Sequence, residues 1–260
     1  MKFNLSTRLN NDPTPSMWWY TAWTRTKARF VRTYLGNIWI GLSNLLAVSV
    51  LGFVYRYVFS VDNFKYYFAY LAIGLTLWGF ISGTILAASG VFQMTRDRSL
   101  NSEFTPSYFF LEEFTFQFLC FVQASLPILL VTTIFGMVKF TNYFIAILPT
   151  INMLLIVFSF SGISALIGGK FKDAGQLFPV IFQLMFYISP ILFLRSAMGK
   201  AYIIAAYNPI YRSLSSVRTA LLDGNISLGI QFASLPILLI ISYWIYRLIV
   251  KYRNKIILWY

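Results

Sequence analysis

Long apolar runs separated by short polar or charged connections make up most of the chain from residue 38 onward. Each run is close to the ~20 residues that an α-helix needs to cross the hydrocarbon core of a bilayer. The pattern therefore predicts an all-α integral membrane protein formed by a single transmembrane domain over residues 1–260. We expect six transmembrane helices, at residues 38–59, 67–92, 114–137, 144–167, 177–193 and 228–246.

The segment ahead of the first run, residues 14–35, has a different pattern. Aromatic residues recur at helical spacing on one face and most basic residues lie on others, which is typical of an amphipathic helix at the membrane surface. One interpretation is an anchor held by anionic lipid. The other is that basic residues near the first span also guide an anionic, lipid-linked substrate. The residues proposed for this second role are Arg25, Arg29, Arg32, Tyr34 and Gly36.

Charged residues interrupt the chain again at residues 94–106, between the second and third apolar runs. Arg96, Asp97, Arg98 and Glu103 precede Pro106 there. The segment fits a short cytoplasmic helix. A solvated loop is the alternative, but its length and mixed charge favour a docking segment for a soluble partner.

A broken hairpin follows the fifth run. Two short helices are expected within residues 200–222, at about 200–207 and 209–222. The chain breaks at Ser189-Pro190 before them and at Asn208-Pro209 between them. Non-helical backbone at membrane depth is tolerated only where it is buried in protein or lines a water-filled path. We therefore expect the hairpin to shape the outer mouth of a conduit. The residues assigned to this gate are Ser189, Pro190, Asn208, Pro209, Arg212 and Arg218.

Composition supports the membrane assignment and narrows the chemistry. Hydrophobic residues are 58% of the chain and charged residues 11%, against about 25% charged in soluble domains. The chain has 21 Lys and Arg, 8 Asp and Glu, no His and one Cys, so imidazole catalysis and a thiolate metal cluster are excluded. Most Lys and Arg fall in segments that share one side of the six-span topology, so the positive-inside rule predicts two cytoplasmic termini.

Other features bear on transport. Carboxylates fall in loops or at span edges, which disfavours a proton- or sodium-driven carrier, and no phosphate-binding loop is present. Gly79 and Gly83 lie one turn apart, so we expect a neighbouring helix to pack closely there, within the subunit or across two subunits.

Aromatic residues form 19% of the chain. Their ring faces suit a path along which a glycan slides, although each ring also fits core or lipid-facing packing. The rings proposed to line this path are Phe53, Tyr57, Phe182, Phe186 and Tyr187.

Four blocks together resemble the permease subunit of type-2 ABC exporters for polysaccharides, and the first two are most similar to O-antigen (lipopolysaccharide) export permeases. The likeness covers nearly the whole chain in order, except that residues 93–113 depart from the usual pattern. The blocks are Ala28–Trp39 (ARFVRTYLGNIW), Tyr70–Gly83 (YLAIGLTLWGFISG), Lys172–Phe193 (KDAGQLFPVIFQLMFYISPILF) and Asn208–Tyr211 (NPIY).

The resemblance implies a homodimer in the bacterial inner membrane, bound to two copies of a separate cytoplasmic ATPase that holds ATP and Mg. Its cargo would be an undecaprenyl-pyrophosphate-linked polysaccharide. By position, residues 14–35 would be the interface helix, 94–106 the cytoplasmic gate or coupling segment, and 200–222 the periplasmic gate helices. No catalytic site, cofactor or nucleic-acid partner is expected in this chain. Two alternatives stay open: a type-2 permease for capsule, teichoic acid or another hydrophobic cargo, and a lipid-modifying enzyme or passive pore.

Overall fold

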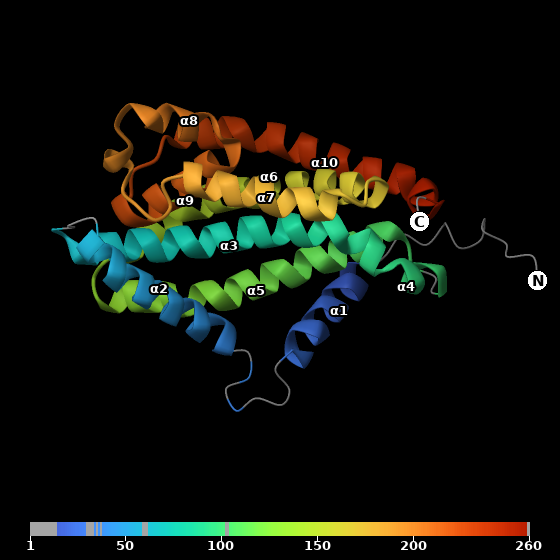
Figure 1. Ribbon diagram of the computed structural model, residues 1–260, viewed down its shortest axis with the longest axis horizontal. Coiled ribbons are helices and arrows are strands. Elements are labelled where there is room, and N and C mark those ends of the chain that lie inside the picture. The colour runs from blue at the N-terminus through green and yellow to red at the C-terminus, as the bar shows by residue number, and fades with distance from the viewer. Residues whose placement is uncertain are drawn as a thin grey trace, which may run out of the picture.

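The computed structural model describes residues 15–29, 34, 36, 38–58, 62–101 and 104–258, and within these ranges the regular elements are all helices (Figure 1). Five helices are long and apolar enough to cross a membrane. These are α2 (Ile38–Val58), α3 (Phe64–Met94), α5 (Pro106–Ile134), α6 (Phe140–Lys170) and α10 (Leu228–Leu258). The expectation of an all-helical, multi-pass membrane protein is confirmed.

The fifth apolar run forms a shorter helix than a standard span. Helix α7 (Ala174–Ile188) has 15 residues, a length of about 22 Å at 1.5 Å per residue. It ends two residues before Pro190, and the chain then runs without helix to residue 194. A sixth crossing that includes this extension stays a prediction.

Helix α3 is the centre of the bundle. It packs against α2, α5, α6, α7 and α9 (Pro209–Asp223), and most of its side chains are buried. The largest apolar cluster joins Ile73, Leu77 and Ile81 of α3 to Met153 of α6 and Leu214 of α9. In Figure 1, α3 runs along the middle of the molecule, with α7 on one side of it and α2 and α5 on the other.

Close contacts between helices occur where glycine removes the side chain. A Cβ added at Gly168 of α6 would lie 1.9 Å from the Ser89 carbonyl oxygen of α3, and one added at Gly41 of α2 would lie 2.3 Å from the Pro127 ring of α5. At Gly79 it would meet no atom within 4 Å, and at Gly83 only the Gln117 side chain at 3.9 Å. The expectation that Gly79 and Gly83 admit a close neighbour within the subunit is therefore wrong.

The helices extend further than the apolar runs. Helix α5 begins at Pro106 rather than near residue 114, and α10 continues to Leu258 through the basic residues that follow the last run. Helix α1 (Pro15–Ala28) is shorter than the predicted segment 14–35, much of the remainder of which lies outside the described residues. Helical hydrogen bonding continues beyond the hydrocarbon, so hydropathy marks the membrane-embedded part of a helix rather than its ends.

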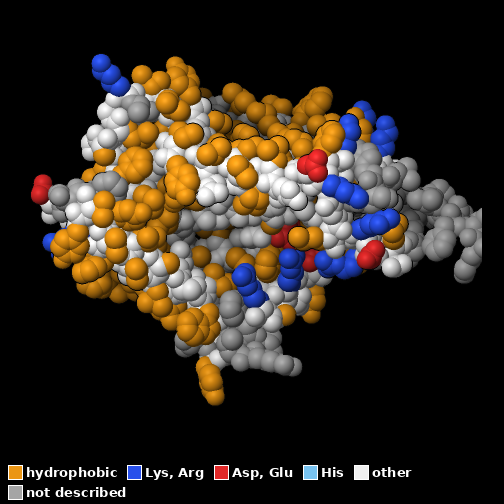
Figure 2. Space-filling view, in the orientation of Figure 1, with side chains coloured by type: hydrophobic (Ala, Val, Ile, Leu, Met, Phe, Trp, Pro, Cys, Tyr) orange, Lys and Arg blue, Asp and Glu red, His pale blue; other side chains and the backbone are white. Residues whose placement is uncertain are grey.

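Charge separates the two ends of the bundle. Helix α1, the short helix α4 (Arg96–Asn101) and the last turns of α10 lie at the same end, where Lys and Arg side chains gather (Figures 1 and 2). We call this the basic end. The opposite end, the hairpin end, carries a 3-10 helix at Arg195–Ala201, α8 (Tyr202–Tyr207) and α9. Two short helices after Pro190 were predicted, and α8 and α9 lie within a residue or two of the expected bounds.

Candidate functional site

A cleft of about 600 Å³ opens at the basic end between α1, α4 and the start of α5. We call it the inner cleft. Cationic, hydroxyl, amide and aromatic side chains line it, a combination suited to an anionic group on a larger molecule. The lining residues are Thr21, Thr24, Arg25, Ala28, Arg98, Asn101, Phe104, Tyr108, Phe109 and Glu112.

An ion pair fixes α1 to α5 along one side of this cleft. Arg25 Nη1 donates to Glu113 Oε2 at 2.7 Å and lies 3.7 Å from Glu112 Oε1. Glu113 Oε1 also accepts a hydrogen bond from Gln117 Nε2 at 2.9 Å, and the Arg25 guanidinium lies 4.1 Å from the Phe116 ring centroid. Both glutamates are buried, so Arg25 compensates charge that would otherwise be costly to hold there.

Helix α1 therefore packs on protein as well as carrying an aromatic surface. Ala22 and Thr26 are fully buried against α5, while Trp19, Tyr20 and Trp23 are exposed. Tyr108 of α5 donates a hydrogen bond to Thr21 at 2.8 Å. Helix α1 is amphipathic, as the sequence predicted. Its aromatic side is exposed, however, and the side that faces α5 consists of small residues and Arg25.

The other residues proposed to guide a substrate are less constrained. Arg29 is exposed, and its Nη1 lies 4.0 Å from Cys120 Sγ. Tyr34 is fully exposed, and Gly36 has a positive φ of 53° with its carbonyl accepting from Trp39 N. Arg32 lies outside the described residues. The guiding role of these residues stays a prediction.

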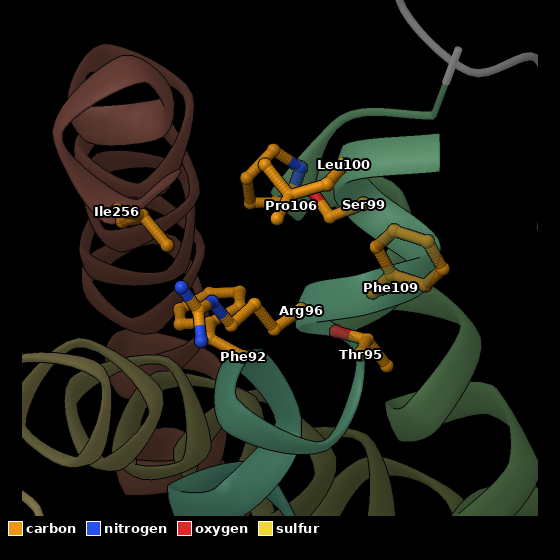
Figure 3. A pocket seen from close by; sticks show the side chains of 8 residues that line it. All are labelled: Phe92, Thr95, Arg96, Ser99, Leu100, Pro106, Phe109 and Ile256. Carbon is orange, nitrogen blue, oxygen red and sulfur yellow. The ribbon is translucent and has the colours of Figure 1, made fainter. Parts of the chain in front are cut away.

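Helix α4 packs against α3 and α10, and a pocket lies where these helices meet the start of α5. The cavity between them has a volume of only about 10 Å³, enough for about one water molecule. Arg96 of α4 extends across this space toward Ile256 of α10 (Figure 3). Arg98 lies 5.6 Å from the Phe109 ring centroid and Asp97 is exposed, while Glu103 lies outside the described residues. The proposed coupling segment is therefore a short helix braced by two long ones.

The open face of α3 lies between α2 and α7, and Figure 2 shows a hollow across this side of the molecule. Gly79 is exposed on that face, and Gly83 is partly exposed. On α2, Phe53 (59% exposed) and Tyr57 (67% exposed) form an edge-to-face pair at 5.3 Å. Small residues of α3 and aromatic rings of the neighbouring helix α2 are therefore accessible from outside the described bundle.

The aromatic residues of α7 divide into two groups. Phe182 is only 6% exposed and packs against Trp78 of α3 at 6.0 Å between ring centroids, and Phe186 packs on the same indole at 5.8 Å. Tyr187 is 61% exposed and contacts Phe186. In this conformation Phe182 occupies a core position, and Tyr187 is the ring of the three that faces outward.

A buried arginine organises the hairpin end. Arg218 of α9 is 3% exposed, and its guanidinium lies 3.6 Å from the Tyr70 ring centroid. Arg218 Nη1 donates to the Pro190 carbonyl oxygen at 3.1 Å, and Nη2 donates to Tyr211 Oη at 3.3 Å. Tyr70 Oη donates to the same Pro190 oxygen at 2.9 Å. We call Tyr70, Pro190, Tyr211 and Arg218 the outer clamp.

The remaining gate residues lie close to the outer clamp, with one exception. Asn208 caps α9 by accepting from Ile210 N at 3.0 Å, and its side-chain amide lies 3.5 Å from Ser189 Oγ. Pro209 occupies the first turn of α9, where a proline is well tolerated. Arg212 is exposed on α9. Five of the six predicted gate residues are therefore neighbours.

Several residues at these sites were not predicted. Glu112 and Glu113 were placed at the edge of a span, yet both are partners of Arg25. Glu113 is 88 positions from Arg25 in the sequence. Tyr67 and Tyr70 were assigned only to a span, and both donate to carbonyl groups after α7, Tyr67 to that of Leu192. Asn142 of α6 donates to the Leu221 carbonyl near the end of α9 at 2.8 Å. The only sign of these contacts in the sequence is that the hydroxyl and amide groups lie near the ends of apolar runs.

Comparison of the sequence with models of known protein families and with curated proteins gave no match.

Proposed function

We propose that the chain is the membrane-spanning subunit of an ATP-driven exporter that moves an undecaprenyl-pyrophosphate-linked polysaccharide, an O-antigen, out of the cytoplasm. Two copies would form the channel, in the bacterial inner membrane with both termini inside, and two copies of a separate ATPase would power it. The resemblance of four sequence blocks motivates this proposal. The observation that supports it best is the accessible surface formed by α2, the open face of α3 and α7.

One chain leaves this surface unclosed, which is the reason to propose a homodimer. Gly79 and Gly83 have room beside them, and the neighbouring helix α2 carries exposed rings. A second copy facing this surface would enclose a path with a smooth floor and aromatic walls. Such walls offer apolar contact to sugar C–H groups without binding any one sugar tightly.

The two ends suit entry and exit. The inner cleft places Arg25 and Arg98 beside aromatic rings at the basic end, where a pyrophosphate group would arrive from the cytoplasmic leaflet. Because Arg25 is already paired with two glutamates, Arg98 is the cation of the inner cleft that we propose to meet the anionic group. Helix α4 projects at the same end and would receive the ATPase. The outer clamp would hold the exit closed.

A substitution that fills the proposed path tests this function. Gly79→Leu should abolish surface polysaccharide, seen by gel analysis of cell-surface lipopolysaccharide in a strain whose own gene is deleted. Gly229→Leu is the matched control, since Gly229 of α10 also has no atom within 4 Å of an added Cβ. Both variants should reach wild-type levels in the membrane. Normal polysaccharide with Gly79→Leu, or transfer by vesicles that contain this polypeptide alone, would contradict the proposal.

Purification of the complex distinguishes the proposed class from an enzyme or a passive pore. An ATPase with a phosphate-binding loop should co-purify with the wild-type chain. A surface glycan other than O-antigen, lost on deletion of the gene, would instead identify capsule or teichoic acid as the cargo.

A further inference from the structure

A groove runs along the line where α5 and α6 diverge. Both helices pack on α3, which forms the floor, and the space between them has a volume of about 360 Å³. We call it the seam groove. Its walls include Phe121, Ile128 and Leu129 of α5 and Ile147, Ile151 and Leu154 of α6.

The polar side chains in the seam groove have no free hydroxyl hydrogen to offer a ligand. Thr76 donates to the Ala72 carbonyl, Ser125 to that of Val122 and Thr150 to that of Ala146, each within its own helix. Tyr143 lies within hydrogen-bond distance of both Thr133 Oγ1 and the Leu129 carbonyl. A ligand in this groove would therefore meet an apolar surface, which excludes a sugar or a nucleotide as its natural occupant.

The position of the seam groove identifies the medium around it. Leu126 and Leu130 of α5 and Ile147 and Ile151 of α6 are all exposed along its rims, and both helices are membrane spans by length and composition. The groove is thus continuous with the lipid-facing surface of the bundle. Water is excluded at this depth, and hydrocarbon chains are the molecules present.

The dimensions of the seam groove match one lipid tail. From Tyr143 to Leu154 the α6 axis rises about 16 Å, and one leaflet of the hydrocarbon core is about 15 Å thick. With about 30 Å³ for a water-sized group, the 360 Å³ accommodates on the order of a dozen methylene groups.

A cation lies at the hairpin end of the groove. Lys139 is exposed immediately before α6, four residues from Tyr143, and it is the one charged residue in the turn 135–139. The first turn of α6 adds the positive end of the helix dipole. A lipid phosphate above the groove would meet both.

We propose that the seam groove binds one acyl chain of a glycerophospholipid from the leaflet at the hairpin end, with the lipid phosphate at Lys139. The bound chain fills the space between α5 and α6 and holds these helices at their separation on α3. This site depends on the membrane-spanning character of α5 and α6 and not on what the protein transports.

Photo-crosslinking tests the site directly. The purified chain in lipid nanodiscs is irradiated with phosphatidylglycerol that carries a diazirine in its acyl chain, and labelled peptides are mapped by mass spectrometry. Labels should concentrate in residues 121–130 and 143–154 rather than on the exposed face of α10. Thr150→Phe should lower labelling there about tenfold, equivalent to about 1.4 kcal/mol, and Lys139→Gln should also lower it.

Ser43→Phe is the matched control, because Ser43 lies on the membrane-spanning helix α2 with its hydroxyl bonded within that helix. It should leave labelling of the groove unchanged. If Thr150→Phe does not give a monodisperse protein, Val122→Phe fills the same groove from α5. Labels spread evenly over α5, α6 and α10, unchanged labelling in the filled variants, or displacement of the probe by an equimolar polyprenyl phosphate would overturn the proposal.

Discussion

At the scale of single residues, Arg218 and Arg25 show two ways of holding a guanidinium in a membrane protein. Arg218 is buried, and the groups around it are aromatic rings, a phenol oxygen and a carbonyl oxygen. Arg25 is partly exposed and is paired with the buried carboxylates of Glu112 and Glu113. The first arrangement stabilises a break in the backbone, whereas the second joins two helices.

Removal of the Arg218 side chain should loosen the hairpin end. Arg218→Ala removes a cation–π contact and two charged hydrogen bonds, with a combined stabilisation of about 3 kcal/mol. We expect a lower thermal unfolding temperature and faster proteolysis within residues 189–208. Arg212→Ala is the control on the same helix, because Arg212 is exposed. Equal effects of the two substitutions would show that burial of Arg218 contributes nothing.

The Arg25 pair can be measured with a double-mutant cycle. Arg25→Gln leaves Glu113 buried with only Gln117 as a hydrogen-bond partner, which should cost about 2 kcal/mol, less than for a fully buried pair. Arg25→Gln with Glu113→Gln should recover part of that loss. Hydrogen exchange of α1 amides is the measurement, and Lys27→Gln is the control. Additive effects would contradict a coupled pair.

At the scale of helices, the spacing between elements depends on where glycine lies against backbone. Gly168 lets α6 approach the Ser89 carbonyl of α3, whereas Gly79 has open space beside it. Gly79 lies inside a predicted span and Gly168 just after one, but neither position shows in the sequence which helix it will face. The difference arises from the neighbour that each one faces.

This difference predicts opposite outcomes for the same substitution. Gly168→Ala should separate α3 and α6 and lower the free energy of unfolding by about 3 kcal/mol. Gly79→Ala should be neutral or stabilising by up to about 1 kcal/mol, because alanine favours a helix. Unfolding in mixed micelles, followed by circular dichroism, measures both. A destabilising Gly79→Ala would show that a second copy packs tightly on that face.

Helix positions could be predicted from the sequence better than helix contacts. Proline marked the end of α7 before Pro190 and the start of α9 at Pro209, since proline lacks the amide hydrogen that continues a helix. The start of α5 and the end of α10 were missed because the charged turns there remain helical outside the apolar run. The partners of Arg25 and of the Pro190 carbonyl were also missed, because those contacts depend on how distant helices pack.

At the scale of the whole molecule, charge distinguishes the two ends. Lys170, Lys172 and the basic residues of α1, α4 and α10 lie at one end (Figure 2), and the hairpin end has fewer cations. Clustered basic residues remain on the cytoplasmic side during insertion. The same asymmetry is visible in the sequence, because every second connection between spans lies on the same side of the bundle and these connections carry most of the Lys and Arg. The structure places these basic connections at one end.

Topology follows from this asymmetry and can be tested by thiol labelling. Cys120 is the only cysteine in the chain, so Cys120→Ser gives a cysteine-free background. Lys200→Cys should react with a membrane-impermeant maleimide added to intact spheroplasts, and Lys172→Cys should react only after permeabilisation. Both lysines are exposed, so burial does not explain a difference. The reverse labelling pattern would place the basic end outside.

The brace beneath α4 has a mechanical consequence. Helix α10 has 31 residues and is about 46 Å long, whereas the hydrocarbon core is about 30 Å thick. Its final turns therefore extend beyond the lipid as a stiff strut, and α4 packs against α10 and the end of α3. A force on α4 would be divided between this strut and α3, so motion begun at α4 would reach the last helix and the central helix together.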